Sequence, residues 1–166
     1  MRILQVAPCL RPSWGGSATV VRAISKQLVK RGHDVTVYTS DGSAEGKFQN
    51  IEDVKVHFLP TLNSRTSIHT KFFVTPQLNE LVKHEIQRFD LIHLHEYRSF
   101  QNIVIHHYAT KLKVPYVLLA HNSLTRVPSK QRLKWAFDMV FGCRILKDVS
   151  RVIALSRTEA KQYANL

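Results

Sequence analysis

The sequence predicts an α/β fold, a doubly wound parallel sheet of six to seven strands with helices on both faces. Short apolar runs bounded by turn residues alternate along the chain with stretches of helical periodicity. Strands that alternate with helices favour a parallel sheet with right-handed crossovers. The length of 166 residues and the hydrophobic fraction of 44% suit one domain with its own core.

The first strand–helix–strand unit fills the N-terminal quarter of the chain. A buried strand over residues 2–7 stops at Pro8, and a loop with prolines and glycines follows. Apolar residues then recur at helical spacing, with Ser17 as the expected N-cap and Gly32 as the expected residue after the C-cap. The second strand is predicted over 35–38.

The pattern continues to the end of the chain. Further strands are predicted at 54–58, 91–94, 115–120 and 151–155, and further helices at 77–88, 98–113 and 129–148. Ligands of such sheets bind outside the carboxyl ends of the strands. The loops after Ala7, Leu94 and Ala120 are therefore where we expect the chemistry.

The first of these loops ends in Gly15-Gly16 at the start of a helix. Glycines let the backbone approach a ligand closely, and a helix N-terminus offers free N–H groups to a phosphate. An ordinary turn accounts for the pair equally well. The chain lacks the Gly-x-Gly-x-x-Gly fingerprint and the phosphate-binding Gly-Lys-Ser/Thr, so a nicotinamide dehydrogenase is the weakest alternative.

Histidines follow the fourth and fifth strands. His93 and His95 point to the same face of their strand, and His95, at the strand end, is placed to reach the cleft while His93 is packed deeper. His121, followed by Asn122 and Ser123, is placed to bond a sugar or to assist proton transfer; a capping histidine is the alternative.

A metal site would have to combine the two strand histidines with Glu96 or His121. The chain offers neither a cysteine partner nor a ligand pair at helical spacing beside them, so we expect no metal and no cofactor.

The helix predicted at 129–148 is apolar nearly all round, with a narrow polar stripe of Lys130, Lys134 and Asp138. Such a helix is buried on two sides or meets another hydrophobic surface. Burial under the sheet and against a second domain is one interpretation. An interfacial helix that contacts anionic lipid is the other.

The net charge of +12 favours anionic partners. Residues 120–166 carry nine basic and three acidic side chains, yet no five-residue block is purely basic. The sequence also lacks an aromatic–basic platform and a recognition-helix signature. Nucleic acid is therefore not an expected partner.

Five stretches in order resemble the N-terminal domain of GT-B-fold retaining glycosyltransferases, specifically glycosyltransferase family 4. They are Met-Arg-Ile-Leu-x-Val-x-Pro at 1–8, the Gly15-Gly16 loop with its helix to Arg-Gly-His-Asp-Val at 31–35, Asp-Leu-Ile-His-Leu-His at 90–95, Pro-Tyr-Val-Leu-Leu-Ala-His-Asn-Ser at 115–123, and Val-Ile-Ala-Leu-Ser at 152–156. The segment between about 41 and 89 matches less closely.

The resemblance implies a Rossmann-like domain and a reaction. Residues 1–166 would form the acceptor-side domain of a hexosyltransferase-type enzyme, which moves a sugar from a nucleotide donor to an acceptor hydroxyl with retention and without a metal. The C-terminal nucleotide-sugar-binding domain, with its glutamate pair, is expected to be absent from this chain, so we expect no transfer by the chain alone. A stand-alone Rossmann-like module that binds a phosphorylated ligand without catalysis is the alternative.

The resemblance also implies site residues. His121 would be catalytic, beside the reacting sugar, and Gly15 and Gly16 would bind the donor. The expected acceptor-binding residues are Ser13, Trp14, Ser17, His95 and Asn122, with the loop from Arg65 to Phe73 as a further candidate.

The expected partners are a nucleotide-sugar donor, a glycan or lipid-linked acceptor, the chain's own C-terminal domain and an anionic membrane surface. The first residues lack the features of a signal peptide, and no window reaches about 18 consecutive apolar residues. We therefore expect a cytoplasmic protein that binds the membrane face peripherally.

Overall fold

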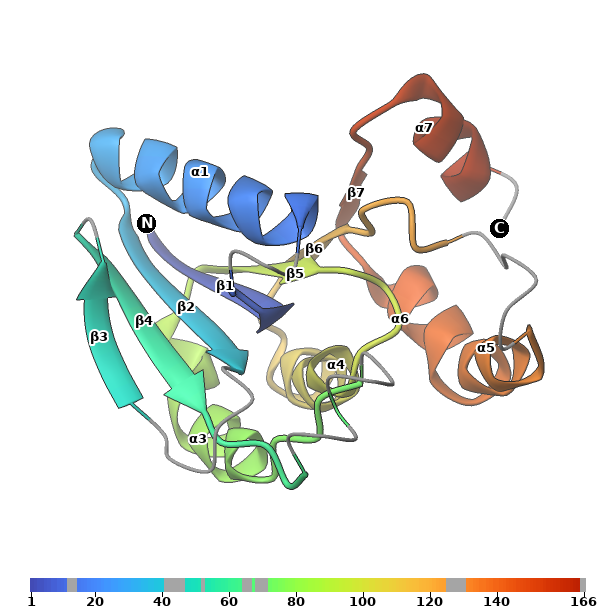
Figure 1. Ribbon diagram of the computed structural model, residues 1–166, viewed down its shortest axis with the longest axis horizontal. Coiled ribbons are helices and arrows are strands. Elements are labelled where there is room, and N and C mark those ends of the chain that lie inside the picture. Colours follow the sequence, from blue (N-terminus) through green and yellow to red (C-terminus); the bar gives the residue numbers. More distant parts are fainter. Residues whose placement is uncertain are drawn as a thin grey trace.

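Seven strands form one sheet in the order β3-β4-β2-β1-β5-β6-β7 (Figure 1). The computed structural model describes residues 1–11, 15–40, 47–51, 53–63, 67, 72–124 and 131–164. In chain order the strands are β1 (Arg2–Cys9), β2 (Asp34–Ser40), β3 (Lys47–Ile51), β4 (Val54–Leu59), β5 (Leu91–His95), β6 (Tyr116–Leu119) and β7 (Arg151–Ile153). The helices are α1 (Gly16–Lys30), α3 (Gln77–Glu85), the 3-10 turn η2 (Ile86–Arg88), α4 (Phe100–Leu112), α5 (Gln131–Phe137), the π-helix η3 (Asp138–Gly142), α6 (Cys143–Asp148) and α7 (Arg157–Ala164).

The strand β1 lies at the centre of the sheet and pairs in parallel with β2 and β5, with Leu4 opposite both Thr36 and Ile92. Six strands run parallel, as the sequence predicted. The seventh, β3, pairs antiparallel with β4 and was not predicted. Its sequence, Lys-Phe-Gln-Asn-Ile, has no apolar run to mark it, and Asp53 takes the left-handed conformation (φ 64°) between the two strands.

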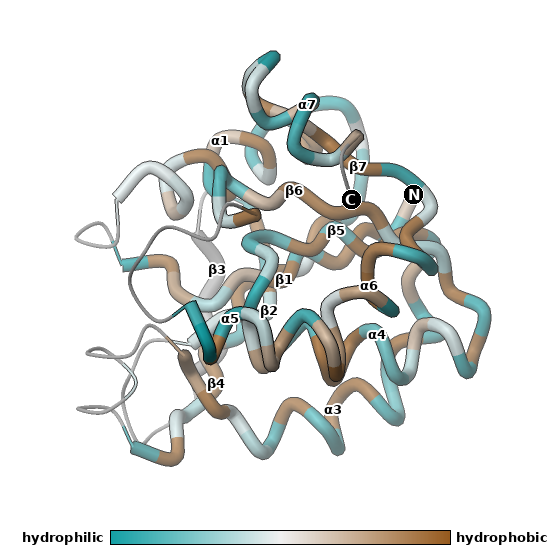
Figure 2. Tube along the Cα trace, turned by 90° about the vertical axis from the view of Figure 1, so that its right-hand side faces the viewer, coloured by the Kyte–Doolittle hydropathy of each residue, from teal (hydrophilic) through white to brown (hydrophobic). Residues whose placement is uncertain are grey.

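Helices cover both faces of the sheet, which confirms the predicted doubly wound fold. Figure 1 shows α1 on one face and α3 and α4 on the other, and Figure 2 shows α3 and α4 side by side. Val35 and Val37 of β2 pack with Val21 under α1. Leu4 and Ile92 pack in the larger core on the opposite face. The alternation of side chains along each strand thus supplies two cores.

The ends of α1 follow from two glycines rather than from a serine. Gly15 is the N-cap, with φ at 94°, so the prediction of Ser17 as the N-cap is wrong. Gly32, with φ at 80°, follows the C-cap as predicted, and its N–H donates to the carbonyl of Val29. Both conformations fall in the region where a Cβ is strained.

The long helix predicted over 129–148 is divided into α5, η3 and α6. No residue of α5 is buried within this chain, so burial under the sheet is wrong for α5, whereas burial against a second domain stays a prediction. Asp138, placed by the sequence on a polar stripe, is instead buried against Arg98. Among the described residues, no helix is long and apolar enough to cross a membrane.

Candidate active site

The loops after β1, β5 and β6 meet at one edge of the sheet, because the carboxyl ends of parallel strands lie together. Hydrogen bonds between the second and third loops show this directly. The N–H of Glu96 donates to the carbonyl of Leu119 (2.9 Å), and the N–H of Tyr97 donates to Oγ of Ser123 (2.9 Å). The second and third of the loops in which we expect the site therefore lie side by side at this edge of the sheet.

Three side chains form a hydrogen-bonded column at this edge. Nε2 of His95 lies 2.6 Å from Oε1 of Gln5 on the central strand, and Nδ1 of His95 lies 3.0 Å from Nε2 of His121. The His93 ring stacks on that of His95, with centroids 4.1 Å apart. His95 is fully buried, whereas His121 is partly exposed. His121 is therefore the end of the column that a ligand can reach.

Burial keeps this column uncharged near neutral pH. Burial lowers the pKa of His93 to about 4, and it holds the pKa of His95 well below 6.5, with the two neighbouring histidines acting in the same direction. Burial also lowers the pKa of His121, although the nearby Glu159 opposes that shift. A neutral imidazole offers one nitrogen that donates a hydrogen bond and one that accepts a hydrogen bond or a proton.

The network also assigns the tautomers of the two bonded rings. The Gln5 oxygen accepts from Nε2–H of His95, so Nδ1 of the neutral His95 carries a lone pair. Nε2–H of His121 then donates to that lone pair, and Nδ1 of His121 is the basic nitrogen. This assignment is inferred from the bonding partners of each ring.

The backbone at His121 is held in an unusual shape by the last helix. His121 and Asn122 both have positive φ, 53° and 59°. The N–H of Asn122 donates to the buried carboxylate of Glu159 (2.7 Å), which also accepts from the N–H of Leu155 (2.7 Å). Two left-handed residues in succession are strained, and this carboxylate compensates by holding the loop.

Tyr163 makes a second link between α7 and the same strand. Its hydroxyl accepts from the N–H of Ala120 (2.9 Å) and donates to the carbonyl of Leu118 (3.4 Å). Burial raises the pKa of Tyr163 to about 12, so the hydroxyl stays protonated. The end of β6, which carries His121, is thus fixed from within the sheet by His95 and from outside it by α7.

Gly15 and Gly16 open α1 at this edge, and both are exposed. A Cβ built at either position would meet no atom within 4 Å. The N-cap residue Gly15 offers no side chain to the first N–H groups of the helix, and among the described residues no such cap is seen. Ser17 lies one residue further in and donates to Oε1 of Glu96 (3.1 Å), so the first and second loops are also joined.

An ion pair below the site fixes the His121 loop to the π-helix. The Arg98 guanidinium donates two bonds to the Asp138 carboxylate, at 2.8 and 2.7 Å. It also donates to the carbonyls of Ser123 and Leu124, just after His121. Both charged side chains are nearly buried, 12% and 7% exposed.

The predicted site residues are brought together in part. Gly15, Gly16, Ser17, His95, His121 and Asn122 all lie at the predicted edge. His95 is sealed behind His121, so its present contacts are those of a positioning residue, and acceptor contact stays a prediction for it. Ser13 and Trp14 lie outside the described residues, as does most of the loop from Arg65. Phe73, at the end of that loop, packs in the interior at 1% exposure.

Sequence reasoning missed Gln5, Glu159 and Tyr163. Gln5 sits inside an otherwise apolar strand, and a polar residue in such a run is the signal that could have identified it. Glu159 is the fourth residue of Ser-Arg-Thr-Glu, a capping-box pattern at the start of α7. Ser156 accepts from the N–H of Glu159 as that pattern predicts. Nothing in the sequence indicates that the carboxylate also reaches Asn122.

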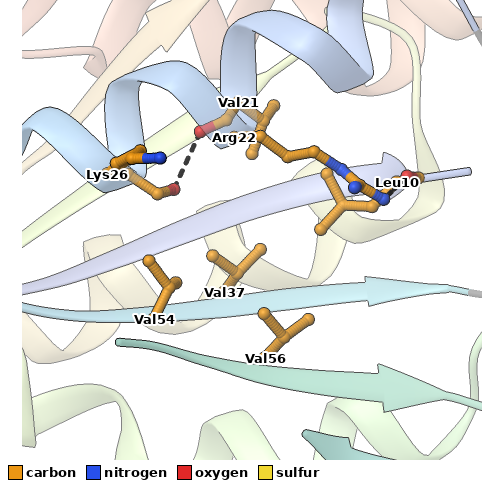
Figure 3. Close-up of a pocket in the computed structure, with 8 residues that line it drawn as sticks. Leu10, Val21, Arg22, Lys26, Val37, Val54 and Val56 are labelled. Atoms are coloured by element: carbon orange, nitrogen blue, oxygen red, sulfur yellow. Dashed lines mark hydrogen bonds between the residues drawn. The ribbon is translucent and has the colours of Figure 1, made fainter. Parts of the chain in front are cut away.

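Within the described ranges, no group of three or more His, Cys, Asp or Glu side chains is arranged to hold a metal ion. A small cavity of about 80 Å³ lies elsewhere, between α1 and the sheet (Figure 3). Figure 3 shows Val37, Val54 and Val56 beneath it and Arg22 turned away to the carbonyl of Leu10. The lining is mostly apolar, and of its polar members Arg22 and Ser25 already donate to the carbonyls of Leu10 and Val21, so the edge with His121 remains the candidate site.

Comparison with known proteins identifies a family. The profile described as Glycosyltransferase Family 4 matches residues 14–166. No curated protein matches the chain.

Solved structures share the fold over nearly the whole chain. HepE of Anabaena, in complex with UDP and glucose, superposes with a TM-score of 0.65 at 19% identity, over 99% of this chain and 41% of HepE. Sucrose-phosphate synthase of Thermosynechococcus elongatus gives 0.68 at 15% identity, over 99% of this chain and 45% of that one. The α,α-trehalose 6-phosphate synthase of Burkholderia multivorans gives 0.57 at 15% identity, with 99% and 41% covered. The chain thus spans less than half the length of these proteins.

Proposed function

This chain belongs to glycosyltransferase family 4, and from that premise we propose that it is the acceptor-binding half of an enzyme that transfers a sugar from a nucleotide donor to an acceptor hydroxyl. The observation that carries the proposal is the fixed, neutral His121 at the strand edge, beside an open helix N-terminus. Donor and acceptor would meet at this edge. We further propose retention of the anomeric configuration, a hexose as the transferred sugar, and no requirement for a metal.

His121 is the proposed catalytic residue. Its Nδ1 accepts a hydrogen bond from a hydroxyl of the bound sugar, because Nε2–H is committed to His95. Proton transfer to a positioned histidine contributes on the order of 10²- to 10⁴-fold in rate. His95 and Gln5 act through His121, since they fix its ring orientation and tautomer.

Gly15 and Gly16 are proposed to bind the donor. The space around both glycines admits a ligand to the backbone, and the uncapped N–H groups of α1 present partial positive charge to a diphosphate. The same groups stabilise the leaving nucleotide as its negative charge develops. Ser13, Trp14, Ser17, His95 and Asn122 are the proposed acceptor contacts.

The chain is proposed to need a second domain for turnover. Neighbours with this fold are more than twice as long, and this chain covers 41–45% of them. We expect the 166-residue chain alone to bind acceptor but not to transfer sugar. Cytoplasmic localisation is part of the same proposal, because nucleotide sugars are its donors.

The test is sugar transfer from a panel of nucleotide sugars that includes UDP-glucose, by the chain alone and joined to the remainder of its reading frame. We expect turnover only in the joined protein, insensitive to EDTA, with the donor's anomeric configuration retained by NMR. His121→Ala should lower kcat by at least 100-fold. His84→Ala, at an exposed histidine on α3, is the matched control and should leave kcat unchanged.

Three results would contradict parts of this proposal. Turnover by the 166-residue chain would show that it needs no second domain, and an inverted product would refute retention. Full activity of His121→Ala would refute the role of the histidine. Binding of a nucleotide sugar without transfer by either protein would favour a phosphate-binding module without catalysis.

A further inference from the structure

The helix pair α5–η3 exposes an unusual number of large apolar side chains. Leu133 is 70% exposed, Met139 62% and Trp135 54%, and Val140 and Phe141 are exposed beside them. We refer to these five residues as the α5 surface. Figure 1 shows α5 at the rim of the molecule, away from the helix α1 that covers the opposite face.

The inward side of the same helix makes both apolar and polar contacts, and Phe137 at the end of α5 packs against the core and Tyr97. Asp138 is the buried residue of η3 that meets the protein, and it does so through the Arg98 ion pair. Gly142, also buried, lies against the ring of Tyr97. An ordinary surface helix has its apolar residues inward and its charges outward. Here the helix is anchored on its inner side by Phe137 and Asp138, yet it also exposes large apolar side chains outward, beyond those that its own packing uses.

The exposed charges near the α5 surface are mainly positive. Arg132, Arg144 and Lys147 are exposed on α5 and α6. Of the three acidic residues of 120–166, Asp138 and Glu159 are buried, and Asp148 is 42% exposed but bonded to His106. Asp138 pairs with Arg98, Asp148 accepts from His106 (2.8 Å), and Glu159 accepts backbone N–H bonds. In the described part of this segment, the exposed charge is therefore mainly positive.

We propose that the α5 surface binds the interface of an anionic bilayer. Its apolar side chains would enter the boundary between headgroups and acyl chains, and Arg132, Arg144 and Lys147 would contact lipid phosphates. Trp135 suits this depth, because an indole ring has an apolar body and a polar N–H that stays near the headgroups. The combination of exposed apolar, aromatic and mainly basic groups is complementary to such a surface.

The α5 surface lies close to the candidate site. The Arg98 guanidinium joins Asp138 of η3 to the carbonyls that follow His121. A bilayer at the α5 surface would therefore lie next to the edge that carries the candidate site. The inference itself rests on exposure and charge and does not depend on the proposed glycosyl transfer.

The test is sedimentation of the 166-residue chain with vesicles of phosphatidylglycerol and phosphatidylcholine, and with phosphatidylcholine vesicles alone. We expect binding to the anionic vesicles in 25 mM salt and at least tenfold weaker binding to the neutral ones. Leu133→Ser with Met139→Ser should weaken binding at least tenfold. Leu62→Ser, at a leucine 75% exposed elsewhere on the molecule, is the control and should not.

The charge contribution has its own matched pair of variants. Arg132→Gln with Arg144→Gln and Lys30→Gln with Lys111→Gln each remove two positive charges, but only the first pair borders the α5 surface. We expect only the first pair to weaken binding and to reduce its salt dependence. Circular dichroism should show that every variant keeps the fold.

Fluorescence reports whether Trp135 itself enters the lipid. The chain has two tryptophans, so Trp14→Phe leaves Trp135 as the only one. We expect its emission to shift to the blue on anionic vesicles and to be quenched by brominated acyl chains.

Three results would overturn the proposal. The first is no binding to anionic vesicles. The second is equal loss in both charge-pair variants without a blue shift of Trp135, which would indicate a general electrostatic effect. The third is self-association of the chain, abolished by Leu133→Ser, in place of vesicle binding; this would assign the α5 surface to a protein interface.

Discussion

Removing one partner of the ion pair between Arg98 and Asp138 should be among the most destabilising single changes outside the apolar core. Replacing Arg98 by Met leaves a carboxylate that is 7% exposed without its guanidinium, and it removes the bonds that Arg98 donates to the carbonyls of Ser123 and Leu124. Breaking a buried pair by removing one partner destabilises proteins by about 3–5 kcal/mol. We therefore expect Arg98→Met to lower the free energy of unfolding by roughly that amount.

The matched control is the exposed pair of Lys55 and Asp34, whose side chains are 51% and 52% exposed. An exposed ion pair contributes about 0–1 kcal/mol, so Asp34→Ala should be nearly silent. In urea, a loss of 4 kcal/mol moves the unfolding midpoint by about 2 M if the slope is near 2 kcal/mol per M. The two variants should therefore separate clearly in one titration followed by circular dichroism.

A double-mutant cycle distinguishes the pair from loss of packing. Arg98→Met combined with Asp138→Leu removes both charges, and we expect it to be at least 2 kcal/mol more stable than the sum of the single changes predicts. If Arg98→Met does not fold, Arg98→Lys keeps the charge, loses the bidentate geometry and gives a measurable intermediate. Equal midpoints for Arg98→Met and Asp34→Ala, or additive single changes, would refute the reasoning.

Two further predictions concern Gly142, next to this ion pair, and His93, which stacks on His95. Gly142→Ala should lower the free energy of unfolding by about 1–3 kcal/mol, because the added Cβ would lie 2.9 Å from Cζ of the buried Tyr97 and 3.1 Å from Oδ1 of Asp138. Tyr97→Phe should recover part of this loss. If the two substitutions have additive effects on thermal unfolding, the explanation is refuted. The pKa of His93 is about 4 in the folded protein and near 6.5 in the unfolded chain, so between these values the unfolded chain binds a proton that the folded protein does not. The contribution of His93 to the free energy of unfolding should therefore be complete above pH 6.5 and should decrease as the pH falls toward 4. His93→Leu should remove roughly 3 kcal/mol of that decrease in urea titrations at several pH values, and an unchanged pH profile would show that His93 is not the cause.

The sequence predicted those parts of the fold that depend on local patterns. Six parallel strands were predicted because runs such as Ile3-Leu4 and Leu118-Leu119 are buried on both faces, and the family was predicted from five short stretches and is confirmed. The antiparallel β3 was missed because an edge strand needs no apolar run.

The site was predicted less completely, because its supports come from distant parts of the chain. The edge was found from the positions where strands end, and His121 and Gly15 lie there. Gln5 reaches His95 across 90 residues, and Glu159 reaches Asn122 across 37. Neither partner is visible in a local pattern. The exposed α5 surface was likewise ambiguous, because periodicity shows that a helix is apolar but not which side faces inward.

The strand order also means that the two halves of the sheet are synthesised one after the other. Residues up to Leu59 make one contiguous half of the sheet, β3-β4-β2-β1, and β5, β6 and β7 make the other. The two halves meet in the pairing of β1 with β5. At roughly 5–20 residues per second, a ribosome needs about two to seven seconds to extend the chain from Leu59 to His95. For that interval the free edge of β1, with Ile3, Leu4 and Val6, is an open template for another chain, so newly made protein is most prone to aggregation just before β5 emerges.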